Sequence, residues 1–147
     1  MGEFQSAFVM IVCAGRVLIV KRRKKSLWGL PGGGIDEGES PLAAAIRETR
    51  EEAQLVLNQA ELSPHTNYRT AHVQEVDRKA IVVFRAEFKT QRMPVLNEEH
   101  TDYAWLPLAD AVRLELHHSA HYAIQTEREE LLAIASRTSF VKLRRRR

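Results

Sequence analysis

Residues 33–55 read GGIDEGESPLAAAIRETREEAQL, and this stretch determines the fold expected for the chain. Ser40 can cap the N-terminus of a helix, and Pro41 suits the first helical position because its missing amide is not needed there. A helix is therefore expected from about Pro41. At about 100° per residue, its apolar positions form one stripe that would pack on the core. The stripe consists of Leu42, Ala45, Ile46, Thr49 and Ala53.

Three acidic residues lie on another side of this predicted helix. Glu48, Glu51 and Glu52 are spaced three and four apart, so their carboxylates share an arc of roughly 100°. Each pair costs roughly a few tenths of a kcal/mol in repulsion, and the negative end of the helix adds to that cost. A cation removes both costs, and ligation by oxygen alone favours a hard ion such as magnesium. Taken alone, however, a run of this kind is more commonly a solvated helix face.

The spacing of six residues favours the metal site. The pattern is Gly, five residues, Glu, seven residues, Arg-Glu, two residues and Glu-Glu. It resembles the Nudix box, the signature of hydrolases that split nucleoside diphosphates linked to another moiety. The matching residues are Gly33, Glu39, Arg47, Glu48, Glu51 and Glu52.

Thr49 and Gln54 depart from the box. Thr49 stands where an aliphatic residue is usual, but its methyl can pack in the stripe and its hydroxyl can bond back to the preceding turn. Gln54 stands where the box has its second glycine. A glycine there would end the helix in a left-handed conformation, which costs other residues roughly 1 to 2 kcal/mol. We expect the helix to continue past Gln54 instead, with Asn58 as a later stop.

The resemblance implies an α/β fold, the Nudix-type α/β/α sandwich with a mixed β-sheet. It also implies magnesium-dependent hydrolysis of a pyrophosphate bond, with manganese as an alternative ion. The implied metal ligands are the Gly32 carbonyl, Glu48, Glu51 and Glu52. The implied catalytic residues are Glu48, Glu52, Arg47 and Glu99. The glutamates among them are alternatives for the base, and Arg47 is expected to brace a box carboxylate.

A basic segment and a glycine turn precede the box. The successive glycines at 32–34 allow the backbone to approach a ligand and to aim amides at phosphate oxygens. Lys21–Lys25 form a basic cluster that would attract polyphosphate, with a solvated loop as the alternative. Trp28 could stack a base, although a tryptophan among leucines is more commonly a core residue. The candidate substrate-binding residues are Arg22, Arg23, Trp28, Gly33 and Gly34.

Hydrophobic patterning predicts the remaining elements. The expected strands are Ala7–Cys13, Arg16–Lys21, His65–Val76, Ala80–Lys89 and Tyr103–Leu106, with a hairpin turn at Ala14-Gly15 and a loop over Thr90–Thr101. The expected later helices are Leu108–Leu114 and Ser119–Ser136. Strands around a central helix, followed by a terminal helix, agree with the sandwich that the resemblance implies.

Histidines and a second acidic group lie outside the box. The resemblance makes Glu99 an extra metal ligand or the base, whereas a solvated acidic loop is an equal alternative. His117 and His121 stand four apart, as in some zinc helices. No third ligand is evident for them, so they are interpreted as surface residues.

Length and composition limit the other possibilities. The 147 residues suit one domain, which we expect over residues 1–139, followed by a disordered basic tail over 140–147. There is no apolar run long enough to span a membrane and no signal peptide. The single cysteine, Cys13, fits a reducing compartment, so a cytoplasmic location is expected.

The net charge of +3 arises at the C-terminal end. Lys142 and Arg144–Arg147 supply five of the 22 basic residues, which leaves 17 basic against 19 acidic residues, a net of −2, in the remainder. Such a tail could bind nucleic acid, but a solvated end is the favoured interpretation.

The favoured substrate is a ribo- or deoxyribonucleoside triphosphate, hydrolysed to a nucleoside monophosphate and pyrophosphate. ADP-ribose, dinucleoside polyphosphates and RNA 5′ ends are alternatives. A Nudix-fold regulatory module that binds nucleotides without turnover is an alternative of another class. The intact Glu48, Glu51 and Glu52 argue against that module, because degenerate members typically lose these residues. The sequence leaves a homodimer open.

Overall fold

The computed structural model describes residues 4–62, 72–76 and 79–145. The strands are β1 (Ser6–Cys13), β2 (Arg16–Arg22), β3 (Trp28–Gly29), β4 (Gly32–Gly34), β5 (His72–Val76), β6 (Lys79–Glu87) and β7 (His100–Pro107). The helices are α1 (Pro41–Ala53), a 3₁₀ turn η1 (Gln59–Glu61), α3 (Leu108–Ala111) and α4 (His118–Arg145).

β1 is the centre of one mixed sheet. It pairs antiparallel with β2 and β4 and parallel with β6. Beyond these neighbours, β3 and β7 pair with β2, and β5 pairs with β6. β1 is buried on both faces because its side chains are apolar at every position from Ala7 to Cys13. Alternate side chains therefore enter two separate cores: Ala7, Val9, Ile11 and Cys13 enter one, and Phe8, Met10 and Val12 enter the other.

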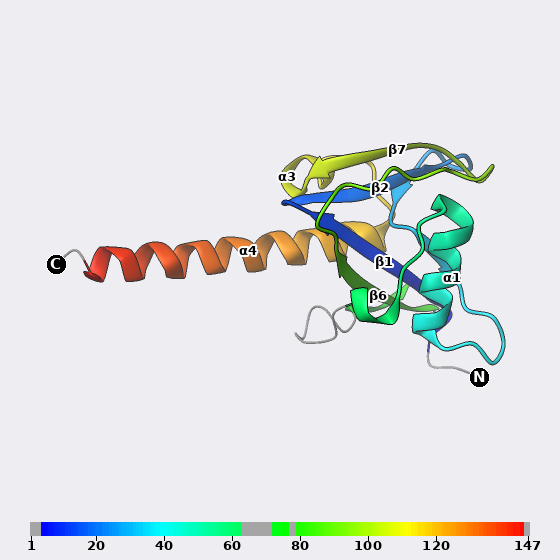
Figure 1. Ribbon diagram of the computed structural model, residues 1–147, viewed down its shortest axis with the longest axis horizontal. Coiled ribbons are helices and arrows are strands. Elements are labelled where there is room, and N and C mark those ends of the chain that lie inside the picture. The colour runs from blue at the N-terminus through cyan, green and yellow to red at the C-terminus, as the bar shows by residue number, and fades with distance from the viewer. Residues whose placement is uncertain (1–3, 63–71, 77–78, 146–147) are drawn as a thin grey trace.

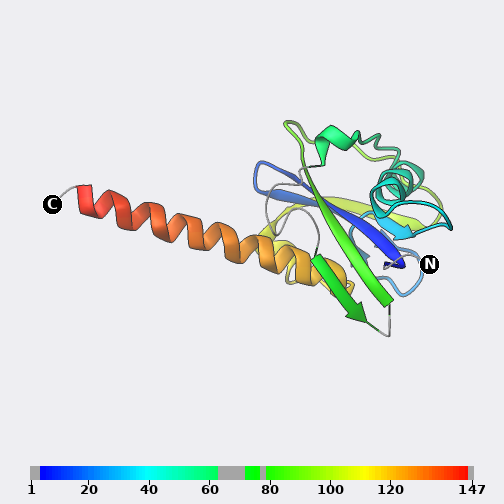
Figure 2. The same ribbon diagram turned by 90° about the horizontal axis from the view of Figure 1, so that it is seen from below.

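One helix covers each face of the sheet (Figures 1 and 2). α1 contributes the buried Ala44, Ala45 and Ala53 to the first core. The first turns of α4 contribute Ala120, Ala123 and Ile124 to the second core, beside α3. The predicted α/β/α sandwich with a mixed sheet is thereby confirmed.

Several local predictions are confirmed. The β1–β2 hairpin turns at Ala14 and Gly15, whose φ angles are 49° and 77°. α1 begins at Pro41, and the Ser40 hydroxyl accepts a hydrogen bond from the Ala43 amide at 3.1 Å. Cys13 is a buried free cysteine. Of the predicted strand His65–Val76, the part from His72 is present and residues 65–71 lie outside the described residues.

The expected continuation of α1 past Gln54 is wrong. Gln54 caps the helix in the left-handed conformation, with φ 53° and ψ 31°. The last carbonyls of α1 explain why the helix ends there. The Glu52 carbonyl accepts the Asn97 amide at 3.0 Å, and the Ala53 carbonyl accepts the Val95 amide at 2.8 Å. A continuing helix would need these carbonyls for its own next turn.

The C-terminal half of the fold also differs from expectation. β7 begins at His100, so the predicted loop over Thr90–Thr101 ends earlier, and α3 is a single turn. α4 runs to Arg145 instead of ending near Ser136, because no glycine or proline follows Pro107 to stop it. α4 includes residues 140–145 of the expected tail, and the disorder of that tail stays a prediction. The domain boundary at residue 139 stays a prediction.

Candidate active site

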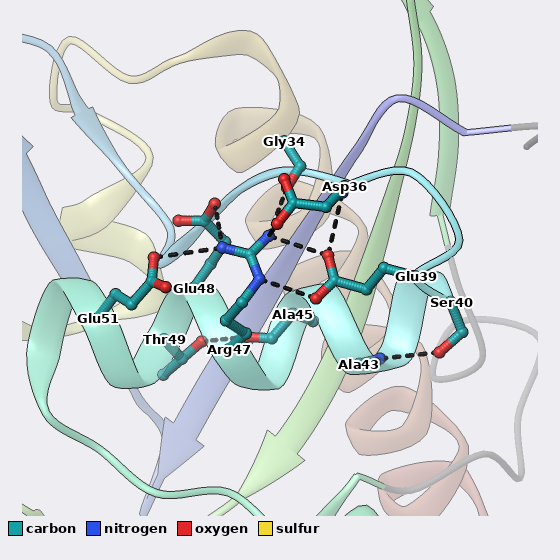
Figure 3. Close-up of polar contacts among 10 residues, drawn as sticks. All are labelled: Gly34, Asp36, Glu39, Ser40, Ala43, Ala45, Arg47, Glu48, Thr49 and Glu51. Atoms are coloured by element: carbon teal, nitrogen blue, oxygen red, sulfur yellow. Dashed lines mark hydrogen bonds and ion pairs between the residues drawn. The ribbon is translucent and has the colours of Figure 1, made fainter.

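α1 presents its acidic residues away from the first core. The Thr49 side chain is fully buried, and its hydroxyl donates to the Ala45 carbonyl at 2.7 Å, as predicted (Figure 3). Glu48 and Glu51 therefore lie on the opposite, accessible side, where their side chains are 16% and 55% exposed. Thr49 can therefore stand in place of the usual aliphatic residue, because its buried hydroxyl is hydrogen-bonded.

Arg47 connects the box carboxylates (Figure 3). Its guanidinium donates to both oxygens of Glu39 at 2.8 and 2.9 Å, to Glu48 at 3.1 Å and to Glu51 at 3.2 Å. A further bond of 3.0 Å goes to the Gly34 carbonyl. The Arg47 hydrogen bonds and the Asp36 amide lower the pKa of Glu39 to about 2. Arg47 consequently fixes the loop before α1 to the acidic face of α1.

Glu52 is the most unusual carboxyl of the site. It is only 5% exposed, and its Oε2 accepts a hydrogen bond from the Gly32 amide at 3.1 Å. Burial raises its pKa to about 8, and the nearby Glu48 adds to the increase. The Gly32 amide and the charge of Arg22 act in the opposite direction. Burial likewise raises the pKa of Glu48, against the influence of Arg47.

Two glycines permit this close packing. Gly32 has φ +148°, and a Cβ there would lie 2.3 Å from the Ala7 carbonyl oxygen. A Cβ on Gly33 would lie 2.8 Å from the Glu48 carboxyl carbon. Both contacts are shorter than real Cβ atoms allow, so β4 brings its backbone against β1 and α1 only because these residues lack side chains. Instead of the predicted free turn, residues 32–34 form a short strand.

One cavity of about 570 Å³ collects most of the predicted site residues. It is lined by Arg22, Arg23, Lys24, Gly32, Gly33, Gly34, Glu48, Glu51, Glu52, Glu98, Glu99 and His100. The predicted metal ligands, the loop glutamate Glu99 and two predicted substrate-binding arginines are therefore close together, although they come from four segments of the chain. Trp28 does not line this cavity. It is half-buried, and it packs against the second core with the Lys21 ammonium 5.8 Å from its ring centroid.

The loop that carries Glu99 is tied to β2 and α1. The Arg23 amide donates to the Glu99 carbonyl at 2.8 Å, and the Arg23 side chain donates to the Glu98 carbonyl at 2.9 Å. The Asn97 side-chain oxygen accepts the Glu99 amide at 3.1 Å. The sequence assigned Arg23 to substrate and did not identify Asn97. Nothing in the local pattern around Arg23 reveals its contact with Glu98, 75 residues away.

His100 is a further residue, to which the sequence assigned no role. Its side chain is buried, and Nε2 lies 4.0 Å from Oε2 of Glu52, too far for a hydrogen bond. Burial lowers its pKa, and Arg22 acts in the same direction. Nδ1 lies 3.1 Å from the Asn97 side-chain oxygen. The only available signal was its position directly after Glu99.

The expectation that His117 is a surface residue is wrong. Its ring is half-buried, and the ring centroid lies 3.9 Å from that of His118 and 6.1 Å from that of Phe8. Burial lowers the pKa of His117 to about 4. It lines a second cavity of about 510 Å³, which shares Arg22, Gly33 and Gly34 with the first. His121 is exposed, as predicted.

The chemistry of the first cavity suits a hard divalent cation. Its candidate ligands are all oxygens, and burial raises the pKa of both Glu48 and Glu52, a cost that a bound cation would offset. Within the described residues, no three acidic, His or Cys side chains are already gathered as a metal cluster. Arg47 instead forms ion pairs with Glu48 and Glu51, and Glu52 accepts a hydrogen bond from the Gly32 amide.

Comparisons with known proteins agree with this geometry. The NUDIX domain profile matches residues 3–126. The asymmetrical bis(5′-nucleosyl)-tetraphosphatase of Mus musculus is 33% identical over 88 residues, which cover 59% of this chain and 60% of that protein. The Sus scrofa enzyme of the same name is 30% identical over 110 residues, covering 74% and 75%. The aligned region thus spans about 60% of the mouse relative's length.

Solved structures share the fold. A binary complex of the Caenorhabditis elegans Ap4A hydrolase superposes with a TM-score of 0.73 at 24% identity, covering 88% of this chain and 99% of that one. No helix within the described residues is both long and apolar enough to cross a membrane.

Proposed function

The chain belongs to the Nudix family, and on that premise we propose that it is a pyrophosphohydrolase acting on nucleotides that carry a polyphosphate chain. One observation supports this proposal above the others. Glu48, Glu51, Glu52 and Glu99 line a single cavity that the basic residues Arg22, Arg23 and Lys24 also line. The carboxylates suit a cation, and the basic residues suit phosphate oxygens.

The proposed metal ligands are the Gly32 carbonyl, Glu48, Glu51 and Glu52, with magnesium as the favoured ion and manganese as the alternative. When bound, such an ion supplies positive charge that neutralises the phosphate oxygens around the bond to be broken. Arg47 maintains the orientation of Glu48 and Glu51 through its hydrogen bonds. It is a positioning residue in this proposal, because its guanidinium is engaged with carboxylates.

Hydrolysis requires a group that accepts a proton from the attacking water. Water attacks one phosphorus, the bridging P–O bond breaks, and the proton passes to a carboxylate. Glu48, Glu52 and Glu99 are the candidates for this carboxylate. We assign Glu52 as a ligand and Glu48 as a ligand or the base, with Glu99 as the remaining alternative for the base.

The basic residues of the cavity support a substrate with several phosphates. Arg22 lines both cavities, so it can contact a phosphate chain that extends from one into the other. A nucleoside triphosphate brings more negative charge to this position than ADP-ribose does, and we therefore propose a nucleoside triphosphate as the substrate. A dinucleoside polyphosphate is the second candidate, because the mouse and pig relatives are named for a substrate of that class.

A substrate panel tests this function. Purified protein with magnesium is given a nucleoside triphosphate, diadenosine tetraphosphate, ADP-ribose and a triphosphorylated RNA, and products are identified by chromatography. We expect the highest kcat/KM for the triphosphate, with a nucleoside monophosphate and pyrophosphate as products. Faster cleavage of the tetraphosphate would select the second candidate, and faster cleavage of ADP-ribose or RNA would refute both. Absence of hydrolysis alongside tight nucleotide binding would indicate a regulatory module.

A further inference from the structure

Asn97 begins a tight turn beside the first cavity. The Asn97 carbonyl accepts the His100 amide at 3.3 Å, so residues 97–100 form one turn that leads into β7. Glu98, Glu99 and His100 line the cavity, and Asn97 is not among its lining residues. Any effect of Asn97 on the site must therefore pass through the residues that it contacts.

The Asn97 side chain accepts hydrogen bonds inside this turn. Its Oδ1 lies 3.1 Å from the Glu99 amide and 3.1 Å from Nδ1 of His100. A backbone amide can only donate, so the Asn97 atom that faces it is the oxygen, and Nδ1 of His100 carries a hydrogen to bond the same oxygen. The buried His100 ring thus keeps the Asn97 oxygen directed at the Glu99 amide.

Backbone hydrogen bonds connect the turn to its neighbours on both sides. The Asn97 amide donates to the Glu52 carbonyl at the end of α1, at 3.0 Å. The Arg23 amide, just after β2, donates to the Glu99 carbonyl at 2.8 Å. The amide of Glu99 is therefore bonded to Asn97 and its carbonyl to Arg23. These bonds fix the backbone from which the Glu99 side chain extends relative to Glu52.

A bulge at the start of β7 contributes to the same arrangement. Lys21 pairs with Asp102 and Arg22 pairs with His100, so Thr101 is an additional residue on β7. His100 is buried whereas Thr101 and Asp102 are both exposed, so the usual alternation of a strand is broken there. The additional residue allows the His100 side chain to turn inward, where its Nδ1 reaches Asn97.

We propose that Asn97 is a positioning residue for the hydrolysis proposed above, on which this inference rests: by binding the Glu99 amide, it holds the Glu99 carboxylate in place beside the glutamates of α1. Glu99 is exposed, so its carboxylate would sample many positions if its backbone were released. Loss of a partner that orients a site residue typically lowers activity by about 10- to 100-fold. The KM should change little, because Asn97 does not line the cavity.

Hydrogen exchange at the Glu99 amide tests the contact itself. In the metal-free protein, this amide should exchange faster in Asn97→Ala than in the parent. Asn97→Asp retains an oxygen acceptor and should exchange as slowly as the parent. The rates are measured by NMR. Asn58→Ala is the matched control, because the Asn58 side chain donates to Glu61 and does not line the cavity. Equal exchange in Asn97→Ala and the parent would overturn the proposal.

Steady-state kinetics tests the role in the reaction. With the nucleotide that the parent cleaves fastest, Asn97→Ala should lower kcat about tenfold or more and leave KM nearly unchanged. Asn97→Asp and Asn58→Ala should both stay close to the parent, and circular dichroism should show every variant folded. Glu99→Gln should itself lower kcat. In that background Asn97→Ala should have less than about a twofold further effect, because the two residues act through the same carboxylate.

The kinetic outcomes separate this proposal from the proposed function. The same loss of kcat from Asn97→Ala in both backgrounds would indicate a purely structural role and overturn the proposal. An unchanged kcat for Asn97→Ala or Glu99→Gln, or an Asn97→Asp variant as slow as Asn97→Ala, would overturn it as well. In each of these cases the parent is active, so the proposed function stands. A parent that cleaves no nucleotide would refute the proposed function and the positioning role together.

Discussion

Glu52 shows how strongly a single residue can indicate function. A carboxylate that is 5% exposed loses most of its hydration, and one backbone amide at 3.1 Å replaces only part of it. The adjacent Glu48 makes the negative charge still less favourable. A residue placed for stability alone would not be expected to carry this cost. A cation bound in the cavity during catalysis would offset the cost of burying the Glu52 carboxylate.

This interpretation predicts that magnesium stabilises the protein through Glu52. A ligand present at a hundred times its dissociation constant stabilises the folded state by about 2.7 kcal/mol. We expect saturating magnesium to raise the Tm of the parent and to raise that of Glu52→Gln much less. Differential scanning calorimetry with magnesium and with a chelator measures both increments. Glu129→Gln, on the exposed part of α4, is the control and should respond as the parent does. Equal increments for Glu52→Gln and the parent would remove Glu52 from the ligand set.

Glu39 predicts a pH dependence of stability. Its folded-state pKa of about 2 lies below the unfolded value of 4.5, so its contribution is complete above about pH 4.5 and is lost as the pH falls toward 2. Glu39→Gln should lower the free energy of unfolding by about 1.5 to 3 kcal/mol at pH 7, the usual range for a hydrogen bond to a charged group. Urea titrations should show this difference shrinking as the pH falls toward 2. A difference that is constant with pH would show that the ion pair with Arg47 is not its source.

Gln54 predicts a gain in stability. The left-handed conformation of Gln54 costs a non-glycine residue roughly 1 to 2 kcal/mol. A glycine removes this cost, but its greater freedom in the unfolded chain offsets part of the gain in stability. We expect Gln54→Gly to raise the free energy of unfolding by about 0.5 to 1 kcal/mol. Gln54→Ala retains the strain and serves as the control in the same urea titration. Equal stabilities of the two variants would mean that the backbone is not strained.

Among the helices and strands, the features that depend only on neighbouring residues could be predicted from the sequence. The start of α1 follows from Ser40 and Pro41, and the inward place of Thr49 follows from helical periodicity. The end of α1 could not be predicted in this way. It depends on amides of Val95 and Asn97, which reach its last carbonyls from a segment about forty residues away. Asn58 was a plausible stop only as long as those contacts were unknown.

The C-terminal end of β2 supports a prediction about substrate charge. Arg22→Gln should raise the KM for a nucleoside triphosphate about tenfold, the effect of losing one charge-assisted contact, and should raise the KM for ADP-ribose less. Arg16→Gln, at the opposite end of β2, is the matched control, because Arg16 does not line the cavity. Steady-state kinetics at physiological salt provides the comparison. Equal changes for both substrates would show that Arg22 does not distinguish them by charge.

At the scale of the whole molecule, the site joins parts that the sequence keeps far apart. The box residues could be recognised from their spacing, and so could the fold that the resemblance implied. The position of His100 in the site and the hydrogen bond from Arg23 to Glu99 could not be predicted from the sequence, because both depend on how β7 lies beside β2 in the sheet. The projection of α4 from the body of the protein (Figures 1 and 2) escaped prediction for a related reason, since periodicity alone does not show where the body ends.

The proposed hydrolysis is tested by the rate of nucleoside triphosphate cleavage by the parent and by Glu52→Gln, each with saturating magnesium and with a chelator. We expect the activity of the parent to depend on magnesium. We also expect a folded variant whose kcat is lower by about a hundredfold or more, because the substitution removes charge from a ligand without removing volume. Equal rates for the two proteins at saturating magnesium, or a parent rate unchanged by the chelator, would contradict it.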